Sequence, residues 1–384
     1  MALTKLFKNF FHSEKSGGIA LMICTVASLA LANSALGLQY IDLLNTEFAG
    51  HSLTHWINDG LMTIFFLLIG LELEREIYIG ELSRFKDALL PVLAAIGGVV
   101  VPAGIYLAFN YGTPLQDGAG IPMATDIAFA LGVLSLLGNR VPTALKVFLT
   151  ALAVIDDLIA ILVIAIFYSQ GLELTSLFIA LGIFGLLLIL NRLKIRNLIP
   201  YLLGGAIMWY YMLNSGVHAT ISGVLLAFAI PFGNGDEKST SYILQNFLHY
   251  PVAFIILPIF AIANTAIPIE SRVTDVIASN YGLGIALGLL LGKPIGIVAM
   301  TLLTIKLKLV DLPKQVVWKQ IMGAGFLAGI GFTMSIFITL LAFADQSPEL
   351  VDNAKLVIMI ASLVSALVGF FWLKRNLPAT PAVD

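Results

Sequence analysis

The sequence predicts an all-α polytopic membrane protein. Its 384 residues are 59% hydrophobic and only 11% charged, whereas about a quarter of the residues in an ordinary soluble domain are charged. The apolar residues form long continuous runs, such as residues 17–32, and not the alternating segments of about ten residues that are typical of a membrane β-barrel. The formal net charge of −2 argues against a nucleic-acid-binding protein.

Twelve apolar runs are predicted to be transmembrane helices, because a spanning helix needs about 20 predominantly apolar residues. The connections between them are short, so we expect a single membrane domain over residues 1–384. The predicted spans are 16–36, 57–78, 88–110, 120–138, 143–168, 174–191, 198–212, 216–232, 247–268, 282–303, 320–344 and 351–373.

The basic residues predict the orientation of these spans. If the chain begins on the cytoplasmic side, 18 of the 21 lysines and arginines fall on that side of the membrane. The exceptions are Arg272, Lys293 and Lys355. Basic loops favour the cytoplasmic face of a membrane. We therefore expect both ends of the chain, residues 1–15 and 374–384, to be cytoplasmic.

Four charged side chains fall inside the predicted spans: Asp126, Asp156, Asp157 and Lys293. A charge at the centre of a membrane helix costs roughly 2.5–3.5 kcal/mol on insertion scales, and such residues usually mark an ion or substrate path. Asp59, near the start of the second span, is either a helix cap or a fifth residue of this kind.

Asp156 and Asp157 are neighbours near the middle of the fifth span, where their side chains point about 100° apart on a helix. They are either internal polar groups bonded to other helices or an ion site. Burial and a like-charged neighbour both disfavour the charged form of a carboxylate, so protons bind to such a pair in coupled steps. A small hard cation prefers oxygen ligands and favours the ionised form. Competition between protons and Na⁺ at a site that faces the two sides of the membrane alternately is sufficient for antiport.

Lys293 needs an anionic partner inside the membrane, and the aspartates are the candidates. Its role is a structural ion pair, charge balance during cation release, or proton carriage, and the sequence leaves these open. Pro294 is expected to distort the helix that carries it.

Two spans contain helix-breaking residues near their middle. In span 4, Gly120 and Pro122 precede Asp126, and span 11 contains glycines at 325, 329 and 331. These glycines either break the helix or only allow close packing. Spans 3–5 and 10–12 are two sets of opposite orientation with the broken member in the middle, a pattern that indicates inverted-topology repeats around a midplane site. Asp126 is expected to neutralise the helix N-termini at the breaks and Lys293 the C-termini.

Glu72, Arg75 and Glu76 share one face at the end of the second span through their i,i+3 and i,i+4 spacings. They form either a solvated helix end or a funnel whose carboxylates respond to pH. His218, near the start of the eighth span, is either a structural hydrogen-bonding group or a pH sensor. The other histidines show no ligand spacing to one another.

Six short motifs occur in order along the chain: WINDGLM at 56–62, ATDIAFALG at 124–132, IDD at 155–157, SGVHAT at 215–220, GKP at 292–294 and GIGFTMS at 329–335. Together they resemble the NhaA-type Na⁺/H⁺ antiporters of bacterial inner membranes. The resemblance extends from about residue 16 to residue 372, nearly the whole chain.

The resemblance implies a twelve-helix fold in which the broken spans 4 and 11 cross. It also implies electrogenic export of Na⁺ or Li⁺ in exchange for two protons, which would serve sodium and pH homeostasis. No cofactor and no enzymatic activity are expected. By the same resemblance, Asp156 and Asp157 would bind the cation and the protons, Thr125 and Asp126 would lie at the crossing, Lys293 would pair with Asp156, and Glu72, Arg75, Glu76 and His218 would take part in pH regulation.

Two departures from the family pattern limit what the resemblance implies. Gln245 and Asn246 stand where some members carry an acidic residue and a histidine linked to the pH response, so the pH profile is open. The connection 37–55, a dimer-forming hairpin in some members, is short here, and a homodimer is expected only from the resemblance.

Two other functions use some of the same residues. A Na⁺-coupled symporter would need a pocket for an organic solute, of which the sequence gives no sign. An intramembrane aspartyl protease would use Asp126 with Asp156 or Asp157, but would not need Lys293.

Overall fold

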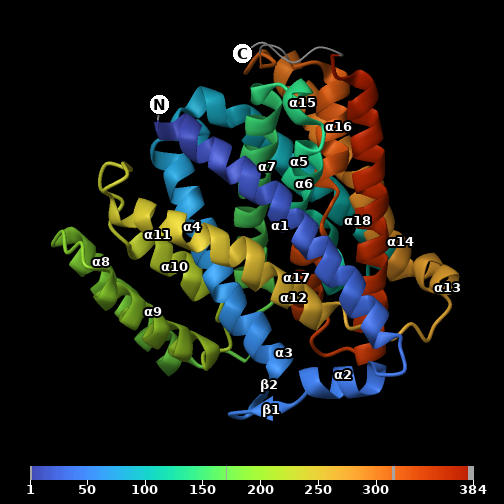
Figure 1. Ribbon diagram of the computed structural model, residues 1–384, viewed down its shortest axis with the longest axis horizontal. Helices are drawn as coiled ribbons and strands as arrows, with labels where there is room; N and C mark the ends of the chain where they lie inside the picture. The colour runs from blue at the N-terminus through green and yellow to red at the C-terminus, as the bar shows by residue number, and fades with distance from the viewer. Residues whose placement is uncertain (1, 170, 314–315, 379–384) are drawn as a thin grey trace.

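The computed structural model describes residues 2–169, 171–313 and 316–378. These residues form a bundle of helices with one short hairpin (Figure 1). Both ends of the described chain lie at one end of the bundle, called here the terminal end, and the hairpin lies at the opposite end, called here the hairpin end.

The first part of the chain, up to residue 167, contains four of the eight long apolar helices of the described residues. Its elements are α1 (Ala2–Ala32), α2 (Gly37–Leu44), β1 (Glu47–Phe48), β2 (His51–Ser52), α3 (Leu53–Trp56), η1 (Ile57–Leu61), α4 (Met62–Tyr78), η2 (Glu81–Ser83), α5 (Phe85–Asn110), η3 (Gln116–Met123), α6 (Ile127–Ser135), η4 (Gly138–Arg140) and α7 (Thr143–Phe167).

The second half adds helices around this group. Its elements are α8 (Leu174–Arg192), α9 (Leu198–Leu213), α10 (Ile221–Ala229), α11 (Thr240–Pro251), η5 (Val252–Ile256), α12 (Leu257–Asn264), α13 (Val273–Ala278), α14 (Asn280–Leu287), η6 (Gly288–Gly292), α15 (Lys293–Lys306), α16 (Trp318–Ala328), α17 (Phe332–Ala342) and α18 (Pro348–Asn376).

Within the described residues, eight helices are long and apolar enough to cross a membrane, and ten if each of two bent pairs counts as one span. The bent pairs are α1 with α2, at 117°, and α16 with α17, at 46°. Every predicted span overlaps a helix, but α9 has 16 residues and α10 only 9. These two short helices account for the difference from the twelve spans that the sequence predicts.

The start of α8 shows how a single side chain can begin one of these helices. The carboxylate of Glu173 accepts hydrogen bonds from the backbone N–H groups of Ser176, at 2.6 Å, and Thr175, at 3.2 Å. These bonds, with Ser176 contributing most, lower the pKa of the exposed Glu173 carboxyl to about 2. Glu173 therefore caps the helix in its charged form.

A π-helical turn, Gly288–Gly292, directly precedes Lys293. Pro294 has no N–H to donate to the preceding turn, and a wider turn lets the helix continue past the missing bond. The distortion that the sequence predicts at Pro294 takes this form.

Close backbone contact holds the helix of Lys293 against α5. A Cβ atom added at Gly296 would lie 2.0 Å from the carbonyl oxygen of Gly97, and one added at Gly97 would lie 2.3 Å from the carbonyl oxygen of Gly296. Only glycine allows this approach. Gly296 is about one helical turn from Lys293, so the contact also sets the position of the lysine.

The substitution Gly296→Ala is therefore expected to push α15 away from α5. Overpacking of a close contact costs roughly 1–3 kcal/mol, so the Tm of the detergent-purified protein should fall by several degrees. Gly104→Ala is the matched control, because an added Cβ there meets no atom within 4 Å and should not lower the Tm. Equal Tm values for the two variants would show that the glycine contact does not stabilise the bundle.

Candidate functional site

Two adjacent carboxylates lie inside the bundle on α7, an apolar helix of 25 residues. The side chains of Asp156 and Asp157 are both completely buried. Since neighbouring residues on a helix point about 100° apart, the two aspartates meet different surroundings, and only one of them finds hydrogen-bond donors.

Asp156 forms a compact polar group with Thr125 and Lys293. The Nζ atom of Lys293 lies 2.5 Å from Oδ2 of Asp156 and 3.0 Å from Oγ1 of Thr125. The hydroxyl of Thr125 is 2.6 Å from the same carboxylate oxygen. The side chain of Lys293 has no exposed surface, so its ammonium is neutralised inside the protein by Asp156. The other oxygen of Asp156, Oδ1, has no hydrogen-bond partner among the described residues.

Thr125 lies in the middle of a helix break. Residues 124–126 are non-helical between η3 and α6, and residues 329–331 separate α16 from α17. The Oγ1 atom of Thr125 lies 2.9 Å from the carbonyl oxygen of Ala328, and the N–H of Asp126 donates to the carbonyl of Ile330 over 2.6 Å. Backbone groups freed by one break are therefore satisfied by the other.

The carboxylate of Asp126 caps two helices at once. Its Oδ1 accepts the N–H of Phe129 in the first turn of α6, at 2.9 Å. Its Oδ2 accepts both the N–H and the hydroxyl of Thr333 in the first turn of α17, at 3.0 and 2.6 Å. Because helix N-termini carry partial positive charge, Asp126 neutralises two of them, as the sequence predicts.

The expected neutralisation of the helix C-termini by Lys293 stays a prediction. The ammonium of Lys293 bonds Asp156 and Thr125, and only the hydroxyl of Thr125 reaches the last carbonyl of α16, that of Ala328. A full negative charge attracts the ammonium more strongly than the partial charge of a helix end.

Asp157 is buried without a partner. Neither of its carboxylate oxygens has a hydrogen bond within the described part of the chain. The charged groups that act on it are Asp156, Asp126, Glu72 and Lys293. These are three carboxyl groups and one ammonium, which is already paired. A buried carboxylate in such surroundings is unfavourable unless a proton or a cation neutralises it.

Glu72, Arg75 and Glu76 lie together toward the terminal end of α4 and are half-buried. Glu72 interacts electrostatically with Glu76 and Arg75, and also with Asp157. The guanidinium of Arg75 lies 5.4 Å from the ring centre of Tyr242 on α11. The group is therefore partly packed against α11, and Glu72 links it electrostatically to Asp157.

His218 lies apart from this group. Its Nε2 atom is 3.0 Å from the carbonyl oxygen of Tyr168, directly after α7, and it interacts electrostatically with Asp59. Asp59 and Glu72 are 13 positions apart on one continuous helix, a separation of about 20 Å at 1.5 Å per residue. The four residues with expected roles in pH regulation thus form two groups.

Sequence reasoning did not find two features of these groups. Glu74 is 4% exposed and its Oε2 has no hydrogen-bond partner among the described residues, although it lies among charged neighbours that suggest a solvated helix end. The rings of His51 and His55 stack with centroids 4.2 Å apart. No spacing rule indicates this pair, because His51 belongs to a strand and His55 to a helix.

Comparisons with known proteins show the family to which the chain is similar. Residues 8–373 match the family model described as Na⁺/H⁺ antiporter 1. A relative from Flavobacterium psychrophilum named Na⁺/H⁺ antiporter NhaA is 64% identical over 380 residues, which are 99% of this chain and 98% of the relative. A protein of the same name from Cytophaga hutchinsonii is 58% identical over 377 residues, 98% of this chain and 97% of the relative.

A solved structure shows a similar fold. The sodium proton antiporter from Methanocaldococcus jannaschii superposes with a TM-score of 0.56 at 16% sequence identity, covering 99% of this chain and 100% of that one. At this identity the similarity concerns the fold alone.

The resemblance that the six motifs indicate is therefore confirmed. The family consists of transporters and not of enzymes, which agrees with the expectation for this chain. From the match over residues 8–373 and the identities over nearly the full length, the chain belongs to the Na⁺/H⁺ antiporter 1 family.

Proposed function

We propose that this chain is an electrogenic antiporter that exports one Na⁺ or Li⁺ in exchange for two protons. Asp157 carries the proposal: it is a buried carboxylate that finds no donor and no free counter-ion among the described residues, next to the Asp156–Lys293 ion pair. An oxygen site of this kind accepts either a proton or a small hard cation. The function would serve sodium and pH homeostasis.

The exchange rests on competition for the two aspartates. Three of their four carboxylate oxygens are buried without hydrogen-bond partners among the described residues, and these oxygens would receive the cation. Binding of Na⁺ requires the ionised carboxylates, so it displaces the proton of Asp157 and a second proton held by the coupled Asp156–Lys293 pair. Two protons for one Na⁺ move one net charge per cycle.

Alternating access would come from the two crossed helix breaks. We propose twelve spans, with α9 and α10 as short seventh and eighth spans, and inverted repeats formed by spans 3–5 and 10–12. Direct hydrogen bonds between the two breaks support this arrangement, because movement of one break must be accompanied by movement of the other. Binding and release would then occur on opposite sides of the same aspartate pair.

We propose a single transporter domain in the bacterial inner membrane with the terminal end in the cytoplasm, since basic residues concentrate there. Residues 379–384 of the proposed cytoplasmic C-terminus lie outside the described part. Only 11% of the apolar window of α8 is buried in the bundle. The exposed apolar side chains of this helix would face lipid. We also propose a homodimer, for which segment 37–55 offers α2 and the β1–β2 hairpin.

A pH-sensitive dye in proteoliposomes tests the exchange itself. With an imposed pH gradient and no organic solute, added Na⁺ or Li⁺ should collapse the gradient. The collapse should be faster when the membrane potential has the sign that drives the net charge movement of the exchange. Absence of collapse at every pH tested would contradict antiport. A requirement for an added organic solute would favour the symporter instead.

The proposed regulatory role of Glu72, Arg75, Glu76 and His218 gives a separate prediction. Glu72→Gln and Glu76→Gln should shift the pH profile of exchange more than its maximal rate, because Glu72 acts on Asp157, and Glu76 on Glu72, only through space. Asp311→Asn, on an exposed loop, is the control and should leave the profile unchanged. If the glutamate variants also keep the wild-type profile, the group is a structural helix end.

A further inference from the structure

The segment η3 leads directly into the helix break of the fourth span. It is a 3₁₀ helix of eight residues. Runs of this helix longer than about three or four residues are uncommon because their hydrogen bonds are poorly aligned, and Pro122 within η3 has no N–H to donate. Thr125, whose hydroxyl bonds the carboxylate of Asp156, follows two residues after the end of η3. Contacts from outside η3 therefore help to fix the position of Thr125.

Two buried tyrosines contact the beginning of η3. Tyr106 belongs to α5, and Tyr168 directly follows α7. The hydroxyl of Tyr106 donates to the carbonyl of Leu115 at 2.8 Å, and the hydroxyl of Tyr168 donates to the carbonyl of Asp117 at 2.6 Å. The side chain of Tyr106 is completely buried and that of Tyr168 is nearly so. Tyr106 and Tyr168 are called here the tyrosine brace.

Two glycines of η3 allow the tyrosine brace to come this close. A Cβ atom added at Gly118 would overlap the hydroxyl oxygen of Tyr106, and one added at Gly120 would overlap the hydroxyl oxygen of Tyr168. Glycine suits positions at which another group closely approaches the backbone. Each hydroxyl of the brace therefore fills the space left by one glycine and bonds a carbonyl beside it.

The other contacts of these segments complete the arrangement. The carbonyl oxygen of Tyr168 lies 3.0 Å from Nε2 of His218, and the N–H of Tyr168 donates to the carbonyl of Ile164 on α7 at 3.2 Å. Toward the crossing, the hydroxyl of Ser335 on α17 donates to the carbonyl of Ile121 at 2.7 Å. Side-chain hydroxyls from three parts of the bundle thus hold η3.

We propose that Tyr106 and Tyr168 are positioning residues for the cation site, which hold η3 so that Thr125 keeps Asp156 in place for the cation. The proposal rests on the antiport function proposed above. Closely packed interiors transmit displacements, so movement at the start of η3 reaches Thr125. The hydroxyl of Thr125 bonds Asp156 and Lys293 at the same time. A site held in its binding geometry binds its ligand more tightly than a loose one.

The substitution Tyr168→Phe keeps the ring and removes only the hydroxyl. The KM for Na⁺ should rise about fivefold, the factor that corresponds to the usual net contribution of one hydrogen bond. The maximal rate should stay within about twofold, as expected when ion binding is weakened but the conformational cycle is not. Tyr106→Phe should raise the KM in the same way. Dye-monitored exchange in proteoliposomes at increasing Na⁺ concentration, at the pH of maximal exchange, measures both quantities.

The matched control for the brace is Tyr201→Phe. Tyr201 is also completely buried, and its hydroxyl donates to the carbonyl of Ile195 at 3.0 Å. It belongs to α9, which packs against α8 and α10. Tyr201→Phe should therefore lower the Tm about as much as Tyr168→Phe does, but keep the wild-type KM for Na⁺.

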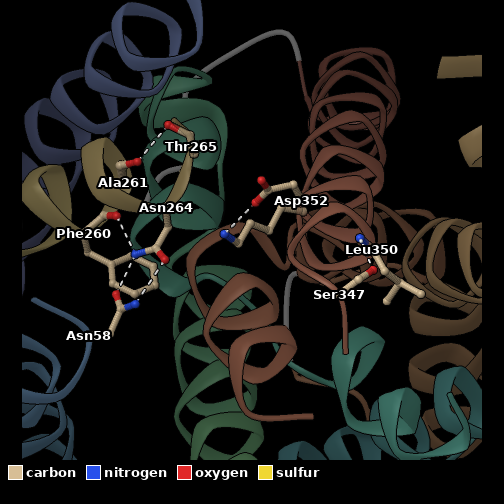
Figure 2. A network of polar contacts seen from close by, with 9 residues as sticks. Asn58, Phe260, Ala261, Asn264, Thr265, Ser347, Leu350 and Asp352 are labelled. Carbon is tan, nitrogen blue, oxygen red and sulfur yellow. Dashed lines mark hydrogen bonds and ion pairs between the residues drawn. The ribbon is translucent and has the colours of Figure 1, made fainter. Parts of the chain in front are cut away.

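A second pair of variants tests the other end of η3 with a smaller side chain. Ser335→Ala removes the bond between α17 and η3 and should also raise the KM. Its control is Thr265→Val. The hydroxyl of Thr265 donates to the carbonyl of Ala261 on α12 at 2.8 Å (Figure 2), so the bond that is lost joins no other element, and the KM should stay that of the wild type.

The outcomes distinguish a positioning role from a structural one. A wild-type KM for both Tyr106→Phe and Tyr168→Phe, even with a lower Tm, would overturn the proposal, and so would an equal rise in KM for Tyr201→Phe. If Tyr168→Phe yields no folded protein, Tyr106→Phe and Ser335→Ala decide by the same criterion. Absence of Na⁺-dependent exchange by the wild type would instead overturn the proposed antiport function.

Discussion

Replacing Asp157 by asparagine is expected to abolish Na⁺/H⁺ exchange and to leave a folded, membrane-inserted protein. Asparagine has nearly the same volume, but it neither binds a proton in the working pH range nor gives a cation a negative charge. Since Asp157 has no hydrogen-bond partner to lose within the described part of the chain, and removal of an unpaired buried carboxylate relieves a cost, the Tm should be equal to or above that of the wild type.

Dye-monitored exchange in proteoliposomes and thermal unfolding in detergent check the two halves of this prediction. Asp275→Asn, at an exposed position on α13, is the matched control and should retain full exchange. Exchange by Asp157→Asn at the wild-type rate would show that the aspartate pair is structural.

Replacing Lys293 by methionine is expected to cause the largest loss of stability. Methionine fills a similar volume, but it leaves the carboxylate of Asp156 buried without its counter-ion, 2.5 Å from where the ammonium had been. Removing one partner of a buried ion pair costs about 3–5 kcal/mol. The Tm in detergent should therefore fall strongly, and exchange should fall with it.

A double-mutant cycle separates lost charge from lost packing. In the double variant D156N/K293M both charges are absent, and most of the stability should return even though exchange does not. Lys293→Arg keeps the charge and should retain more stability than Lys293→Met. Equal Tm values for Lys293→Met and the wild type would show that the ion pair does not hold the helices together.

The burial of the charged residues of the candidate site was predictable, because apolar runs and isolated charges are unambiguous in a membrane sequence. Asp126 and Lys293 were recognisable as buried charges, and the capping of α6 and α17 by Asp126 follows from the helix dipole. The pairing of Lys293 with Asp156 came from the family resemblance, since burial alone does not choose between neighbouring carboxylates.

Other features depend on three-dimensional packing that no local pattern expresses. Asp156 and Asp157 are chemically identical in the sequence, and only the contacts of Thr125 and Lys293 distinguish the bonded carboxylate from the unbonded one. Helix α10 is short because the residues around His218 are non-helical, although the sequence predicts them to be part of an apolar span. The stacking of His51 on His55 depends on the hairpin turn.

The central claim is that protons and Na⁺ displace each other at Asp156 and Asp157, and calorimetry tests it most directly. Na⁺ is titrated into the purified protein in buffers of different ionisation enthalpy, which counts the protons released per cation bound. The account predicts proton release that approaches two per Na⁺ where the site is fully protonated, and none for Asp157→Asn. Binding of Na⁺ without release of protons at any pH at which exchange occurs would contradict it.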